Sequence, residues 1–511
     1  MGYRKLGLEK IKMPTPDKGY FPNKDFDDIP DGGSPSCNQI YWNRSELRPV
    51  PGTTDVTTTA ETSSDGAFYV EFEGVGKRTF ICNGKLFEDV AGNLTNRTGA
   101  VTITSGSLVQ AINHQQGSNK YAIYVNGTDA PWKWTGSGNA AVLGGSPQIF
   151  SCISKHHNII FGSKDETIYF SDVGDPETWD ATNWTIPFEK TVIAHVDNSS
   201  SLAVMKENSI GSIQGYSYLD FTKEEKIISE FGCVGRLAFT KCVYKGTPVI
   251  AVVSKIGVYV FDAAYNFQKI LGGDYFLEFN QEELSGSIIV YDQFEKLLYV
   301  FLPYGSAVTN NYFILINTET GAFWPSGPFT EDGEQFDFQS VAPMKDDSEV
   351  QWIYFFDTSV FTGTAGFVGR FNKDESVFLR GDDPPVRILP TWASKKFDLG
   401  DIFSFREAKL LADADGDYDV DCYLTFGLSA SSSNFASVNL LGTGDLFGST
   451  FILGASTLGG SNYVFKTVSG VSGFGRYYEV KFVGQTTGTP IFGIKSFEML
   501  VKRRRLGSGL D

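Results

Sequence analysis

Short runs of apolar, β-branched residues separated by polar turns recur through most of this chain. The clearest run is Val249–Val253, which is followed by a break at Ser254–Gly257 and a second apolar run at Val258–Phe261. A continuous apolar run of this length is typical of a strand with both faces buried. The segment therefore predicts two β-strands joined by a turn, with Asp262 ending the second strand.

The same pair of runs around a turn is repeated along the chain. Landmarks in seven successive first runs are Phe80, Ala122, Ile159, Leu202, Val249, Leu298 and Trp352, with spacings of 42, 37, 43, 47, 49 and 54 residues. A strand repeat of about 40–50 residues is the signature of a β-propeller with four-stranded blades. Stacking the blades radially buries their faces, and closing the ring protects their edges. We expect residues 53–380 to form a propeller of six to eight blades.

Residues 1–52, before the repeats, have a different pattern. Seven prolines and an acidic stretch at Asp25–Asp31 predict an extended arm that cannot form a strand ladder. The arm also contains Tyr41 and Trp42, so it is either a solvated tail or an arm that docks on a neighbouring subunit through such aromatic residues. The Thr-rich run Thr53–Ala60 follows, and it is a candidate for a strand that closes the ring against the last blade.

Residues 386–505, after the repeats, predict a second β-domain. Short apolar strands alternate at even spacing with Gly- and Ser-rich loops, which is the pattern of a β-sandwich. The domain ends in a basic run, Lys502, Arg503, Arg504 and Arg505, and residues 506–511 form a tail. The run is either a solubilising end or a docking site, for which an acidic protein partner is favoured over nucleic acid. The predicted fold class is all-β.

Composition narrows the function classes. The net charge of −17 disfavours DNA binding through a basic face, although an acidic wall around a DNA conduit agrees with its sign. The six cysteines show no CxxC spacing, so we expect buried free thiols of a protein made in a reducing cytosol. No signal peptide, membrane span or membrane anchor is expected, because the longest apolar runs are well short of about 20 residues.

The polar residues give weak candidates for chemistry. Asp413, Asp415 and Asp417 begin an alternating row of aspartates that could hold Ca²⁺ through carboxylate oxygens. The row is not an EF-hand loop, because Tyr418 and Leu424 occupy two of the required positions, and a solvated acidic hairpin is the simpler interpretation. The four histidines have no zinc spacing, and no hydrolase or phosphate-binding motif occurs. We therefore expect no catalytic residues, no cofactor and no enzyme.

Two alternatives remain open beside an architectural role. Residues 171–179 resemble the Asp-box turn of sialidases with altered spacing, but arginine is too sparse in the repeats for sialidase chemistry. Trp132, Trp134 and Trp184 would suit a glycan-binding propeller if they faced solvent, whereas core packing explains the same residues. A generic propeller scaffold is the other alternative, because fold does not fix function.

Three segments together resemble the tail hub or nozzle proteins of short-tailed bacteriophages, which include packaged-DNA stabilisation proteins. They are residues 40–52, where a Pro-Gly step leads into the repeats, residues 169–179, and residues 392–400 with the closing basic strand. The resemblance implies a virion protein, made in the host cytoplasm, that forms a homo-oligomeric ring, a hexamer in this family. It also implies portal, adaptor and other tail proteins as partners, and a central channel that retains genomic DNA and later releases it.

Overall fold

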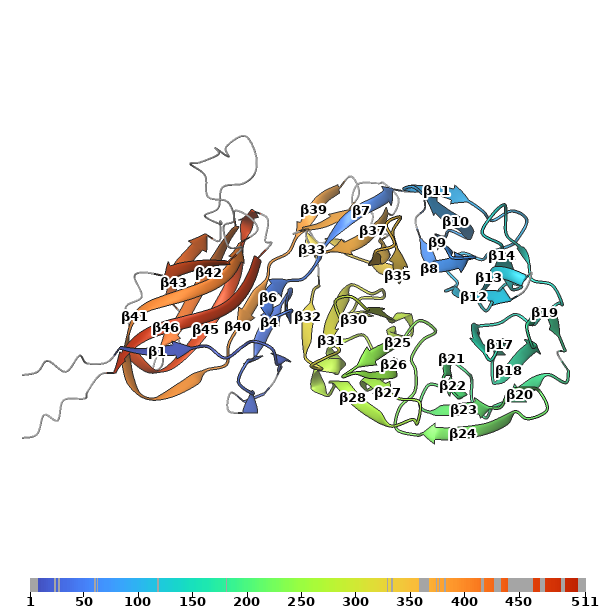
Figure 1. Cartoon of the computed structure of the whole chain (residues 1–511), viewed down its shortest axis with the longest axis horizontal. Helices are drawn as coiled ribbons and strands as arrows, with labels where there is room; N and C mark the ends of the chain where they lie inside the picture. Colours follow the sequence, from blue (N-terminus) through green and yellow to red (C-terminus); the bar gives the residue numbers. More distant parts are fainter. Residues whose placement is uncertain are drawn as a thin grey trace, which may run out of the picture.

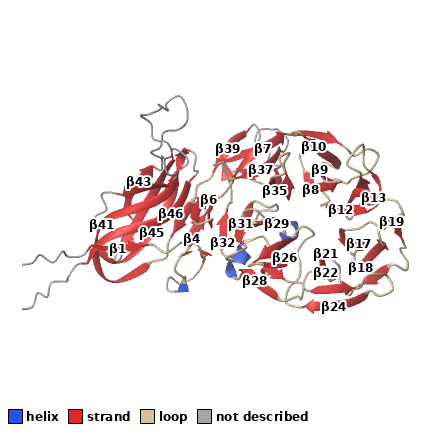
Figure 2. Cartoon of the chain, in the orientation of Figure 1, coloured by secondary structure: helices blue, strands red, loops and turns tan. Residues whose placement is uncertain are grey.

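The computed structural model describes residues 8–503, apart from 23, 26–27, 59–60, 62, 117–118, 181, 329, 332–333, 358–366, 374, 376, 381–382, 415–417, 427–432, 440–462, 469–473 and 489–491. The chain forms two lobes side by side, a wide ring and a smaller sheet domain (Figure 1). Strands and loops make up almost all of both lobes, and the helical segments are short turns such as η2 (Asp274–Glu278) and η3 (Leu284–Gly286) (Figure 2). The predicted all-β class is confirmed.

The ring is a β-propeller of seven blades in the described part of the chain, within the predicted range. From the axis outward, blades 1 to 4 contain β8 (Ser64–Phe72), β9 (Val75–Cys82), β10 (Lys85–Val90) and β11 (Asn93–Asn96); β12 (Gln110–Gln116), β13 (Asn119–Val125), β14 (Trp132–Trp134) and β15 (Ala141–Val142); β16 (Cys152–His156), β17 (Ile159–Lys164), β18 (Thr167–Asp172), β19 (Asp175–Trp179) and β20 (Thr185–Pro187); and β21 (Ala194–Asn198), β22 (Ser201–Met205), β23 (Ile210–Gln214) and β24 (Thr222–Ile228).

Blades 5 to 7 continue the ring, and the last one borrows a strand from the start of the chain. They contain β25 (Phe239–Tyr244), β26 (Thr247–Ser254), β27 (Gly257–Phe261) and β28 (Phe267–Gly272); β29 (Ile288–Asp292), β30 (Leu297–Leu302), β31 (Tyr312–Asn317) and β32 (Phe323–Ser326); and β35 (Phe338–Lys345), β36 (Gln351–Asp357), β37 (Phe367–Asn372) and β7 (Gly52–Thr58).

All seven sequence landmarks lie in the second strand of a blade. This strand has a neighbouring strand on each side and a neighbouring blade against each face, so every side chain of β30 is buried. That environment explains why the second strands are continuous apolar runs rather than alternating ones. The repeat in the sequence is therefore the repeat of the most buried strand.

Strand β7 closes the ring. It pairs antiparallel with β37 from Gly52 opposite Asn372 to Thr58 opposite Phe367, and it becomes the outermost strand of blade 7. The predicted closing segment is thus confirmed for its described residues. Pairing two segments from opposite ends of the repeats removes the free edge that an open series of blades would expose.

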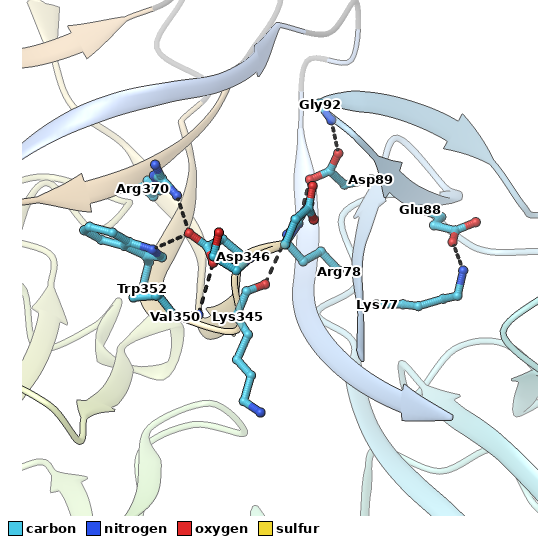
Figure 3. Close-up of polar contacts among 12 residues, drawn as sticks. Lys77, Arg78, Glu88, Asp89, Gly92, Lys345, Asp346, Val350, Trp352 and Arg370 are labelled. Carbon is cyan, nitrogen blue, oxygen red and sulfur yellow. Dashed lines mark hydrogen bonds and ion pairs between the residues drawn. The ribbon is translucent and has the colours of Figure 1, made fainter. Parts of the chain in front are cut away.

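A buried arginine joins blade 1 to blade 7 at the same seam. Arg78 of β9 donates from Nε to Asp89 Oδ2 at 2.7 Å, from Nη1 to the Lys345 carbonyl at 3.1 Å, and from Nη2 to Asp347 Oδ1 at 2.9 Å (Figure 3). Asp89 is held in turn by the Gly92 N–H at 2.8 Å. Because Arg78 and Asp89 are buried, the pair needs these partners to offset its desolvation.

The second lobe is an 11-stranded sheet folded into two layers, a sandwich-like domain as predicted. Its C-terminal strands are β40 (Thr391–Ala393), β41 (Phe397–Ala414), β42 (Tyr418–Phe426), β43 (Ser433–Asn439), β44 (Tyr463–Val468), β45 (Phe474–Gly488) and β46 (Phe492–Arg503). Strand β41 pairs with β44, β45 and β46 along its length, while β45 also pairs with β40 and β42. Phe482 of β45 meets Phe497 of β46 edge-on at 5.9 Å, which places the core between the layers.

The N-terminal segment forms strands of this lobe, contrary to the expectation that it cannot form a ladder. It contains β1 (Leu8–Lys12), β4 (Ser36–Asn38), β5 (Ile40–Asn43) and β6 (Glu46–Pro49). Strand β1 pairs with β46, β4 pairs with β40, and the β5–β6 hairpin reaches β46 through Leu47 opposite Ile494. The prolines lie largely between these short strands or at their ends, where no ladder hydrogen bond is lost.

One continuous core joins the two lobes. It contains Tyr41, Trp42 and Trp392 of the sheet domain together with Tyr299 and Phe371 of blades 6 and 7. The hairpin is also fixed by polar contacts, because Asn43 Nδ2 donates to Glu295 Oε2 at 2.7 Å and Arg44 Nη2 lies 3.1 Å from Glu295 Oε1. The lobes are therefore packed against each other rather than linked by a loose tether.

Candidate functional site at the propeller axis

The innermost strands of the seven blades surround a small hollow on the propeller axis. The hollow has a volume of about 370 Å³, and residues of all seven innermost strands contribute to its wall. Much of the wall is apolar, with half-buried side chains such as Phe68, Ile112 and Phe239. The hollow at the axis is therefore small, and most of the residues that line it are apolar.

Arg236 lies across one mouth of this axial space. It belongs to the loop that leads into β25 of blade 5, yet Nη1 donates to the carbonyls of Leu108 at 3.1 Å and Asn126 at 2.8 Å in blade 2. Two blades lie between these positions on the shorter way round the ring, so the side chain reaches across the axis. Burial lowers the pKa of Arg236, because loss of solvent disfavours its charged form.

Gln110 of β12 adds a second contact between blade 2 and the Arg236 loop. Its Nε2 donates to the Arg236 carbonyl, and its Oε1 accepts a hydrogen bond from the Ile153 N–H of blade 3 at 3.0 Å. A polymer could pass along the axis only if these contacts broke. The propeller is thus closed at this mouth by its own side chains.

Two polar pairs connect blades 3 and 4 beside the axis. Ser154 Oγ lies 2.5 Å from His195 Nδ1, and His156 Nδ1 lies 2.6 Å from Asp197 Oδ1. Lys241 of blade 5 completes the second pair, with Nζ 2.6 Å from Asp197 Oδ2. The contacts run between neighbouring innermost strands, so they tie the blades together.

These residues do not form a catalytic triad. A nucleophilic serine needs a histidine that is itself oriented by a carboxylate, whereas here Asp197 contacts His156 and Ser154 contacts His195. Burial lowers the pKa of His195 to about 3, far below the range of a general base at neutral pH. Burial also lowers the pKa of His156, and its hydrogen bond to the Asp197 carboxylate only partly opposes this shift.

The structure describes part of the aspartate row proposed for calcium and all six cysteines. Asp413 lies in β41, while Asp415 and Asp417 are outside the described residues. Within the described residues, no group of three or more His, Cys, Asp or Glu side chains is arranged to hold a metal ion. All six cysteines are buried and unpaired, as predicted. The calcium hypothesis therefore gains no support from the described part of the aspartate row.

The predicted docking residues fall into two groups. Tyr41 and Trp42 are only 2% and 7% exposed inside the core shared by the two lobes, so the expectation that they contact another subunit is corrected: their partner is this chain. Lys502 and Arg503 are the last residues of β46, where Arg503 is exposed, and Arg504 and Arg505 lie outside the described residues. Docking through the basic end stays a prediction.

Two of the three tryptophans that would suit glycan binding are fully buried. Trp132 and Trp134 are 0% exposed and pack among the strands of blades 1 and 2. Trp184 is half-buried against Phe170. The core-packing interpretation is therefore correct for Trp132 and Trp134.

Sequence reasoning did not find Arg236 or Gln110. Neither belongs to a recognisable motif, and each acts on a blade far from it in the chain. A lone arginine in a loop between two predicted blades is the one local signal, and such residues are usually solvated.

The described part of the chain also contains no helix with the length and hydropathy needed to cross a bilayer.

Comparisons with known proteins give no family. No protein-family model matches the chain, and no curated protein matches its sequence. Similar solved structures include the extracellular domain of a hybrid two-component system from B. thetaiotaomicron, which is 9% identical with a TM-score of 0.42 over 63% of this chain and 40% of that one. A chain in the mitotic checkpoint complex is 10% identical with a TM-score of 0.39, over 63% of this chain and 94% of that one. At these values, neither similarity bears on function.

Proposed function

We propose that this protein is a non-catalytic structural subunit of a short phage tail, part of a hub or nozzle ring. The observation that carries the proposal is the single core that packs a closed propeller against a sheet domain built from both ends of the chain. Such a body suits a load-bearing subunit, because its relative orientation of lobes is fixed by apolar packing. The resemblance of three sequence segments to tail hub proteins supplies the particular assembly.

The closed axis supports one refinement of this proposal. Arg236 and Gln110 close one mouth of each propeller, so a DNA conduit would run between subunits of the ring and not through a propeller. The net charge of −17 agrees with such a conduit, because an acidic wall does not hold phosphates as lysine and arginine contacts would. The partners in this proposal are copies of the chain and adjoining tail proteins.

Mass measurement under native conditions tests the proposal. The purified 56.2 kDa chain should form a closed oligomer, alone or after addition of the tail proteins encoded beside it. Replacement of Arg503, Arg504 and Arg505 by Ser should weaken docking on an acidic neighbour while leaving the fold intact. A protein that stays monomeric with every neighbouring tail protein would overturn the ring, and unchanged docking of the triple variant would remove the role of the basic end.

A further inference from the structure

A second hollow lies outside the closed mouth of the propeller. It has a volume of about 670 Å³ and is lined mainly by residues in or next to loops that precede or connect the inner strands of blades 2 to 5, with Ser285 ahead of blade 6. Arg236 lines both this outer hollow and the axial hollow, so it forms part of the wall between them. The outer hollow is accessible from solvent, because Lys164 and Ile149 on its wall are exposed.

The guanidinium group of Arg236 is fixed with one edge unused. Both of its hydrogen bonds to blade 2 are donated by Nη1, and no described residue accepts a hydrogen bond or forms an ion pair with Nε or Nη2. Nε and Nη2 are the pair of donors that binds a carboxylate side-on with two parallel hydrogen bonds. Because Nη1 is anchored, that edge is already oriented, which lowers the entropic cost of binding.

The surroundings leave room for an anion. A Cβ atom on Gly127 would lie 3.1 Å from Arg236 Nη2, so a glycine at this position keeps the guanidinium edge uncrowded. Two cations, Arg236 and Lys164, line the hollow against one carboxylate, Asp165. Asp65 and Asp129 are not among the residues that line the hollow, and each accepts a hydrogen bond from a backbone N–H group, of Gly106 and of Thr104 respectively.

The rest of the wall favours a peptide over a bare ion. Leu108 and Ile193 are half-buried and present apolar surface to the same hollow as Arg236. Such a mixture suits a short segment with one acidic side chain and small apolar neighbours, whereas a phosphate-rich polymer would leave that apolar surface unused. We propose that this hollow binds an acidic side chain of a partner protein, with its carboxylate on Nε and Nη2 of Arg236.

Saturation-transfer NMR with two matched peptides tests this site. N-acetyl-Ala-Glu-amide should bind the full-length protein at least about tenfold more tightly than N-acetyl-Ala-Gln-amide, because only the former offers a carboxylate to the arginine. Inorganic phosphate at equal ionic strength is the third ligand, and its binding is measured by how well it competes with the Glu peptide. Equal binding of the two peptides would overturn the proposal, and so would tighter binding of phosphate, which would mark a general phosphate site.

Variants locate the binding within the hollow. Arg236→Lys should abolish the preference for the Glu peptide, since lysine cannot present two parallel donors. Lys164→Gln should weaken binding about threefold and, because Lys164 is exposed, should not disturb the fold. Lys269→Gln on the outermost strand of blade 5 removes the same charge far from the hollow, and it should bind as the parent does. Unchanged binding by both hollow variants would overturn the assignment, and a melting curve confirms that each variant is folded.

Discussion

The propeller and the sheet domain are assembled from the chain in opposite ways. Six propeller blades are made of strands that follow one another in sequence, so most of their pairing is between near neighbours. The sheet domain combines strands from both ends of the chain, and the hydrogen bond from Ser34 Oγ to the Ala393 carbonyl at 2.6 Å joins residues 359 positions apart. One lobe is therefore built by local repetition, and the other is built by bringing the two ends of the chain together.

The largest expected effect comes from removing residues 1–51. This truncation keeps β7 but deletes β1, β4, β5 and β6, so the sheet domain loses pairing strands and the buried Tyr41 and Trp42. We expect loss of stable structure in the sheet domain, lower protection in blades 6 and 7 where the shared core is uncovered, and retained protection in the rest of the propeller, measured by hydrogen–deuterium exchange of each lobe. A chain that lacks residues 506–511 is the control. Full protection of β40 and β46 in the truncated chain would contradict the comparison.

Two tryptophan substitutions, one in each lobe, test whether the lobes are stabilised separately. Trp132→Ala in blade 2 and Trp392→Ala in the sheet domain each remove a fully packed side chain, at a cost of about 3–5 kcal/mol in unfolding free energy. Trp132→Ala should leave exchange in the sheet domain unchanged, whereas Trp392→Ala should loosen both lobes because it lies in their shared core. Denaturant unfolding gives the cost. Identical exchange maps for the two variants would contradict the distinction.

The closure seam is the place where the propeller itself depends on distant residues. Arg78→Met leaves the buried Asp89 carboxylate without its partner and should cost about 3 kcal/mol of unfolding free energy. Asp347→Asn, at the exposed end of the same network, should cost less than about 1 kcal/mol. Thermal and urea unfolding measure both. Similar costs for the two variants would mean that Arg78 does not act through the buried pair.

Acid should weaken the propeller selectively, because all four histidines lie in blades 2 to 4. The folded pKa of His195, about 3, is below the unfolded value of about 6.5, so its stabilising contribution is present above pH 6.5 and is lost as pH falls toward 3. The expected loss from His195 is about 2 kcal/mol at pH 5. Lowered pKa values of His114 and His156, also caused by burial, act in the same direction.

Urea unfolding at pH 7 and pH 5 measures this effect, and His195→Gln isolates it. Burial raises the pKa of Asp65 to about 6, so protonation of that carboxyl recovers some stability over the same range in both proteins. The variant should therefore show a shallower loss than the parent between the two pH values. Equal losses would show that His195 is not the residue that titrates.

Sequence periodicity predicted the propeller because one strand per blade is buried on both faces. The runs around Leu298 and Val249 mark second strands, and the Thr-rich run near Thr53, a candidate for the closing strand, pairs with β37. The other lobe was only partly predictable. The prolines near Tyr41 suggested an arm, and no local pattern shows that β4 and β6 pair with strands more than 300 residues later.

The polar contacts at the axis were not predictable from the sequence, again because their partners are distant along the chain. Arg236 acquires its role from carbonyl groups of blade 2, and those carbonyls carry no sequence signal of their own. Trp132 and Trp134 show the converse limit, since composition identifies them as aromatic anchors but cannot decide between surface and core. They are in the core because blade 1 packs over them.

Strand β7 also sets an order of events during synthesis. It is translated before any blade, but Thr54 Oγ1 accepts its hydrogen bond from Asn372 Nδ2, which the ribosome adds 318 residues later. Until then β7 has no pairing strand, blade 1 lacks the packing of blade 7 against it, and the sheet domain lacks its C-terminal strands. The propeller can close only after β37 is translated, and the sheet domain only after β46. An interrupted chain would therefore display unpaired strand edges that quality-control proteases and chaperones recognise.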